Sequence, residues 1–183
     1  MTSHLYKRTL VRISLMAITL LTIGTAVNGQ NAKPTVYKIA EAGVQIELPS
    51  GWEASKDPSG NHVISKKDAG GYVVFSISVL PRDASVSFDS LYGAFSEGIF
   101  EEAKKDWKGF QPGTVVKDSQ NGMALRAQKF DGSMESAGGE LEGIVILIDS
   151  AKPLGIFGQR TKKHSDLLDT ESTQILTSIK KVQ

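Results

Sequence analysis

Three consecutive residues, His164, Ser165 and Asp166, bring together the residue types of a hydrolytic triad. A triad is defined by side chains that converge in space, whereas consecutive residues at the entrance to a helix point in different directions. The same stretch is typical of a helix start, at which Asp166 would serve as the N-cap. We therefore interpret it as a solvated helix cap rather than as a nucleophilic site.

Other residue types that bind metals or act as nucleophiles are scarce. The chain has no Cys and three His residues, of which only His62 and His164 follow the N-terminal segment. Zinc sites in proteins draw on several Cys and His ligands, so this composition argues against one. Cysteine nucleophiles are excluded outright. The chain also lacks the Gly-x-Ser-x-Gly elbow of the α/β-hydrolases and the glycine-rich phosphate loop that opens a helix.

Carboxylates gather in one stretch, at Asp131, Glu135, Glu140 and Glu142. A calcium loop alternates oxygen ligands around a glycine, and residues 131–135 do not follow that pattern. We favour a solvated loop, and weak cation binding near Asp131 and Glu135 stays open. A glycosidase would need two carboxyls at a set separation, which the sequence does not place. We therefore predict no catalytic, cofactor-binding or metal-binding residue.

The first 29 residues have the layout of a secretory signal peptide. Lys7, Arg8 and Arg12 precede a mostly apolar run from Ile13 to Val27, and cleavage is expected after Gly29. The run is short for a membrane span, although an uncleaved anchor is the alternative. No Cys follows it, so lipid attachment at a cysteine is excluded. We predict a periplasmic or extracellular protein that has no stable membrane span after cleavage.

The mature chain offers no electrostatic attraction for nucleic acid. The chain has 21 basic and 20 acidic residues, and residues 1–29 hold three of the basic ones and none of the acidic, which leaves a net charge of −2. The pairs Lys162-Lys163 and Lys180-Lys181 flank the last predicted helix. We interpret them as a solvated face rather than as a site for an anionic membrane.

The rest of the chain is expected to form one domain, residues 36–183, after a flexible leader at 30–35. An apolar/polar alternation predicts a strand at 44–48, paired with another at 36–39. Pro49 would end the strand in a type I turn over Leu48–Gly51. Trp52 follows this turn, and we predict that it is a structural plug in the core rather than a ligand-stacking residue.

A long helix is predicted between two groups of strands. Strands at 62–66 and 72–80 precede it, and the helix spans Ser87–Gly109, with Ser87 as N-cap and Gly109 as a left-handed C-cap. Its apolar stripe consists of Phe88, Leu91, Tyr92, Phe95, Ile99 and Ala103.

A meander is expected after the helix. Asn121-Gly122 predicts a hairpin that joins strands at 114–120 and 123–130, and a polar loop is expected at 131–139. The strand at 141–149 is apolar on both faces at residues 144–148, which indicates a sheet covered on both sides. A strand at 154–159 and a helix from Asp166 complete an α+β pattern.

Several of these features resemble one known family. The motif Leu48–Trp52, the amphipathic helix, the Asn-Gly hairpin and the terminal Ile175–Ser178 segment occur in this order. Over residues 36–181 the chain resembles the Mog1/PsbP-like superfamily, and in particular small exported bacterial proteins, many without known activity. The resemblance implies a three-layer α/β/α sandwich with a mostly antiparallel central sheet. Related folds include an extrinsic photosystem subunit and a nuclear transport factor, which act by docking to partners, but none of their docking residues can be matched here.

Three hypotheses for function follow. The first is an exported, non-enzymatic binding or accessory domain that acts, as a monomer, on an unknown protein or cell-envelope partner. The second is a small-ligand carrier with a pocket between the sheet and the long helix, lined by Tyr92, Phe95, Phe100 and Trp107. The third is a hydrolase that uses scattered carboxylates. We favour the first.

Overall fold

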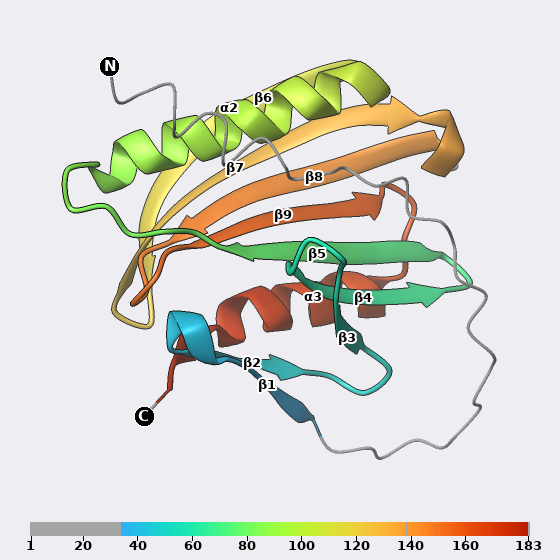
Figure 1. Ribbon diagram of the computed structural model, residues 1–183. Coiled ribbons are helices and arrows are strands. Elements are labelled where there is room, and N and C mark those ends of the chain that lie inside the picture. Colours follow the sequence, from blue (N-terminus) through green and yellow to red (C-terminus); the bar gives the residue numbers. More distant parts are fainter. Residues whose placement is uncertain (1–33, 138, 183) are drawn as a thin grey trace.

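The computed structural model describes residues 34–137 and 139–182. The predicted signal peptide and residues 30–33 of the predicted leader therefore lie outside the described residues, whereas Thr35 already belongs to the first strand. Within the described part, one large sheet forms the middle of the molecule, with a layer on each face (Figure 1).

The large sheet has seven strands in the order β3-β4-β5-β9-β8-β7-β6, and each neighbouring pair is antiparallel. The strands are β3 Glu53–Lys56, β4 His62–Asp68, β5 Gly71–Val79, β6 Lys108–Gln120, β7 Met123–Met134, β8 Gly139–Ile148 and β9 Leu154–Thr161. A two-residue turn of type I′ needs positive φ at both central positions, and Asn121 and Gly122 supply φ values of 48° and 73°. The predicted hairpin is confirmed.

One face of this sheet is covered by the long helix α2, Phe88–Asp106. The other face is covered by helix α3, Asp166–Ser178, and by a small sheet of three strands, ordered β1-β2-β10. These strands are β1 Thr35–Ile39, β2 Val44–Leu48 and β10 Lys180–Lys181, and short 3-10 helices occupy η1 Ala40–Ala42 and η2 Glu135–Ala137. The molecule is an α+β sandwich of three layers, as the sequence predicts.

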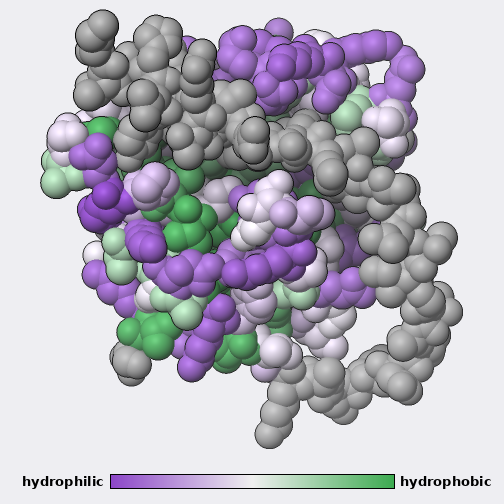
Figure 2. Space-filling view, in the orientation of Figure 1, coloured by the Kyte–Doolittle hydropathy of each residue, from purple (hydrophilic) through white to green (hydrophobic). Residues whose placement is uncertain are grey.

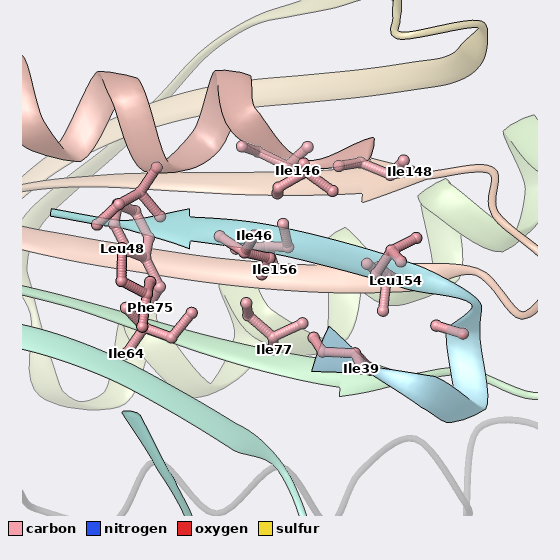
Figure 3. Packing of buried hydrophobic residues seen from close by; sticks show 14 of the residues in the cluster. Ile39, Ile46, Leu48, Ile64, Phe75, Ile77, Ile146, Ile148, Leu154 and Ile156 are labelled. Carbon is pink, nitrogen blue, oxygen red and sulfur yellow. The ribbon is translucent and has the colours of Figure 1, made fainter. Parts of the chain in front are cut away.

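Strand β8 shows why three layers form. Val145 and Leu147 pack with the α2 layer, whereas Ile146 and Ile148 pack with the α3 layer. Strand side chains alternate between faces, so a continuous apolar run needs cover on both sides. Figure 3 shows the α3 side of this core, where Ile46 and Leu48 of β2 face the apolar side chains of the large sheet.

The long helix starts as predicted and ends differently. Ser87 is the N-cap, and its Oγ accepts a hydrogen bond from the backbone N–H of Ser90 at 3.1 Å. The helix ends at Asp106, and Trp107 takes an extended conformation, so the predicted C-cap at Gly109 is wrong. Gly109 does have positive φ (66°), but it lies in β6 beside an irregularity in strand register. Burial of Trp107 in the core turns the chain directly into β6.

The turn after β2 lies one residue later than predicted. The Trp52 N–H donates to the Pro49 carbonyl at 3.3 Å, and Gly51 has φ of 80°. Positive φ at the third residue is the mark of a type II turn, so the predicted type I turn over Leu48–Gly51 is wrong. The glycine is needed for its backbone conformation rather than for a polar turn position.

Two further predictions about local structure are corrected. The predicted loop at 131–139 is largely strand, because β7 continues to Met134 with polar residues on its half-exposed surface. The last helix does begin at Asp166, but its N-cap is Ser165. The sequence predicts no strand at β3, because its four positions are mostly exposed and carry no apolar alternation.

Candidate functional site

The His164–Asp166 stretch forms a helix cap. Ser165 Oγ donates to Asp68 Oδ2 at 2.6 Å and accepts from the Leu168 N–H at 3.1 Å. His164 Nδ1 lies 2.9 Å from the Thr161 carbonyl oxygen. Histidine and serine therefore contact different partners, and the stretch is a helix cap as interpreted, with Ser165 in place of Asp166 as the capping residue.

The four carboxylates of the predicted cation region lie near one another along β7, η2 and β8, but most are matched with cations. Glu142 Oε2 accepts from Arg160 at 2.7 Å and 3.0 Å, Glu140 lies 3.8 Å from Lys162, and Glu135 pairs with Lys108. Asp131 stands opposite Glu142 in the β7–β8 register. Among the described residues, no three His, Asp or Glu side chains converge in a way that would hold a metal ion.

Trp52 joins a buried polar cluster beneath α3. Its Nε1–H donates to Glu171 Oε2 at 2.9 Å, and Lys66 Nζ lies 2.6 Å from the same oxygen. The Trp52 ring stacks on Phe75 with centroids 6.1 Å apart, and the residue is only 8% exposed. The predicted structural plug is confirmed, and its polar edge is satisfied by Glu171, a partner that the sequence analysis did not identify.

A second cluster lies where the small sheet meets β4. His62 is 2% exposed, and its Nδ1 lies 2.8 Å from the Tyr37 hydroxyl, while its Nε2 lies 3.0 Å from Glu41 Oε1. Lys56 Nζ donates to the same Glu41 oxygen at 3.2 Å. A hydrogen bond from its own backbone, followed by those from His62 and Lys56, lowers the pKa of Glu41 to about 2. A carboxylate, an imidazole and a phenol in this order could relay a proton. The His62 imidazole is buried between the small sheet and β4, however, so we interpret the three side chains as a structural link between the two layers.

The aromatic residues of the hypothetical carrier pocket fill the space between α2 and the sheet. A Cβ at Gly155 would lie 2.6 Å from the Phe95 ring, and one at Gly143 would lie 2.0 Å from Phe130. Phe130 also contacts Trp107, with ring centroids 5.0 Å apart. A small hollow of about 30 Å³ lies instead near the start of α2, lined in part by Arg82, Phe88 and Pro153, and it has room for about one water molecule.

The least buried element is β6, at one edge of the large sheet (Figure 1). Eleven of its thirteen residues are exposed, including Val115 at 40% and Val116 at 54%. In the view of Figure 2, the described surface is mainly hydrophilic and its hydrophobic residues form small separate patches. The sequence predicted the hairpin of β6 and β7, but not that β6 lies at the edge, because strand order depends on pairings distant in the chain.

No helix in the described part of the chain has the length and apolar character required to cross a membrane.

Comparison with solved structures identifies the fold. The chain is similar to the solution structure of cyanobacterial PsbP (CyanoP) from Synechocystis sp. PCC 6803, with a TM-score of 0.58, 14% sequence identity, and coverage of 87% of this chain and 99% of that one. It is also similar to a crystal structure from Bacteroides thetaiotaomicron VPI-5482, with a TM-score of 0.51, 13% identity, and coverage of 84% of this chain and 50% of that one. No family model matches the chain, and neither does any curated protein. The fold is PsbP-like, as the resemblance implied.

Proposed function

We propose that the protein is an exported, non-enzymatic accessory domain that binds a protein or cell-envelope partner along the edge strand β6. Export is inferred from the basic and apolar N-terminal segment, Lys7 to Val27. A binding role agrees with the resemblance to a superfamily in which two related folds, an extrinsic photosystem subunit and a nuclear transport factor, act by docking to partners. Fold analogy alone is a weak warrant, so the proposal depends on a feature of this chain.

That feature is the length and exposure of the β6 edge. An edge strand presents backbone N–H and C=O groups that can pair with another chain, and proteins usually shorten or cover such an edge. The opposite edge follows this rule, since β3 has four residues, whereas β6 has thirteen. Val115 and Val116 add apolar side chains to the exposed backbone. Peptide recognition by strand addition uses this combination of backbone pairing and alternate side-chain contacts.

The test is site-specific crosslinking of the purified protein in envelope extract. A photoreactive amino acid replaces Val116 on β6 or, as the matched control, the exposed Ser55 on the opposite edge strand β3. We expect one defined crosslinked product from position 116, with a mass different from that of two copies of the chain, and none from position 55. The same products from both positions, or none from position 116, would contradict docking along β6.

A further inference from the structure

The hairpin turn determines which backbone groups of β6 face solvent. In a hairpin with a two-residue turn, the residues that flank the turn form a hydrogen-bonded pair, which here is Gln120 with Met123. The ladder is regular from Val115 to Gln120, after two register shifts nearer the start of the strand. Because backbone groups alternate in direction, every second residue back from Gln120 also bonds to β7.

The intervening residues, Val115, Lys117 and Ser119, point their N–H and C=O groups away from β7. One of these groups already uses a substitute partner, since the Ser119 N–H donates to the Asp118 carboxylate at 2.7 Å. Among the described residues, no other strand lies beside Val115 or Lys117 on this side. Within the described part of the chain, the regular part of β6 therefore has a short outer row of backbone donors and acceptors that no other strand pairs, at Val115 and Lys117.

We propose that this outer row pairs with the same row of a second copy of the chain, antiparallel about a twofold axis at Val116. Val115 of each copy then exchanges two backbone hydrogen bonds with Lys117 of the other. This inference rests on the proposed role of β6 as the docking edge, and it specifies a second copy as an occupant of that edge. The monomer expected from the sequence was predicted without knowledge of which strand lies at the edge.

The side chains and the irregular start of β6 together select this register. A twofold axis normal to a sheet places one residue opposite its own copy. An axis at Lys117 would oppose two like charges, which destabilises a strand pair. An axis at Val115 would pair Lys117 with Gly113, in the irregular stretch before Val115. An axis at Val116 opposes two exposed valines in a non-hydrogen-bonded pair, with Cα atoms about 4.5 Å apart. Lys117 then lies beside Val115 of the other copy and keeps its ion pair with Asp89, in which the Nζ–Oδ2 distance is 3.1 Å.

The irregular part of β6 limits the length of the contact, and the twofold symmetry limits it to two copies. Pro112 and the register shifts before Val115 prevent continuous pairing along the first half of the strand. A twofold contact uses the same edge in both copies, so the assembly closes as a dimer rather than growing into a fibre. The contact is small, so the dimer is expected to be weak and reversible.

Disulfide trapping tests the register, because the chain has no Cys of its own. Val116→Cys places two thiols at a Cα separation that a disulfide can span. Ser119→Cys is the matched control: in the proposed pairing its two copies lie roughly 20 Å apart. Under mild oxidation we expect V116C to form a covalent dimer at least tenfold faster than S119C. Equal rates would overturn the proposal.

A proline substitution tests the backbone hydrogen bonds between the two copies. Lys117→Pro removes an outward N–H and leaves the ladder to β7 intact, whereas Lys117→Gln removes only the charge. Added to V116C, K117P should slow dimer formation at least tenfold and K117Q should not.

In sedimentation experiments, the mass of the unmodified protein should rise between about 1 µM and 1 mM, where weak contacts associate. A constant monomer mass would overturn self-pairing, yet a partner crosslinked at position 116 would leave the proposed function standing.

Discussion

The two faces of the large sheet are held by different physical means. On the α3 face, buried polar groups join the layers through specific hydrogen bonds, as in Trp52–Glu171–Lys66 and Tyr37–His62–Glu41. On the α2 face, contacts are mainly between aromatic rings that fit against glycines of the sheet. Hydrogen bonds fix the orientation of a layer because they are directional, whereas the free energy of apolar packing depends on the volume and shape of the side chains.

The ends of the elements show the same contrast. On the α3 face, Gln120 Nε2 donates to the Leu176 carbonyl at 2.6 Å and Asn121 Nδ2 donates to the Ile179 carbonyl at 2.7 Å, so the β6–β7 hairpin caps the end of α3. On the α2 face, the buried indole N–H of Trp107 has no hydrogen-bond partner in the part of the chain that the structure describes. The α3 layer is thus fixed in position by buried directional bonds. The α2 layer is held mainly by packing, since its ion pairs with the sheet, Lys117–Asp89 and Arg126–Asp89, involve an exposed carboxylate near the start of the helix.

The largest loss of stability should come from removing a buried aromatic ring on the α2 face. Phe130 is 1% exposed and contacts the rings of Phe100, Phe110, Trp107 and Phe157. Phe130→Ala should lower the free energy of unfolding by about 3–5 kcal/mol, because it removes buried area and leaves a cavity. Urea unfolding measures this change. The exposed Val116→Ala is the control and should change stability by less than about 0.5 kcal/mol. A loss below about 1 kcal/mol in F130A would mean that packing is not what holds α2.

The two tryptophans allow a direct comparison of the faces. Trp52→Phe leaves the buried carboxylate of Glu171 without its indole donor, whereas Trp107→Phe removes a buried donor that has no hydrogen-bond partner among the described residues. Both changes remove similar volume, so the difference isolates the hydrogen bond. We expect W52F to lose about 1–3 kcal/mol more unfolding free energy than W107F in urea unfolding. Equal losses would show that the polar tie contributes no more than ring packing.

The cap on α3 should give a smaller effect. Gln120→Ala removes the donor to the Leu176 carbonyl, which is half-buried and lies at the end of the helix. We expect a loss of about 0.5–1.5 kcal/mol in unfolding free energy and faster amide hydrogen exchange in the last turn of α3. The exposed Ser119→Ala, one residue away, serves as the control. Unchanged exchange in Q120A would show that the helix end needs no bond from the hairpin.

Local chemistry predicted much of the fold but little of this contrast. The Asn121-Gly122 hairpin, the Ser87 cap and the two-sided strand at 144–148 each depend on residues close in sequence. The polar ties do not, because Glu171 lies 119 residues from Trp52 and His62 lies 25 residues from Tyr37. Which strand forms the exposed edge is likewise decided by distant pairings. Candidate sites of this kind therefore become visible only with the tertiary structure.

The smallest predicted effect concerns pH and the Glu41 end of the polar face. Hydrogen bonds to its carboxylate from its own backbone, from His62 and from Lys56 lower the pKa of Glu41 to about 2. A carboxylate whose pKa is lower in the folded state contributes stability above its ordinary pKa near 4.5, and this contribution is lost as the pH falls toward 2. The side chain is 39% exposed, so solvent screening should keep the contribution below about 1 kcal/mol. Glu41→Gln should therefore be less stable than the unmodified protein at pH 6, and the two unfolding free energies should converge between pH 4.5 and 2. A difference that stays constant over this range would show that the Glu41 charge does not stabilise the tie between the small sheet and β4.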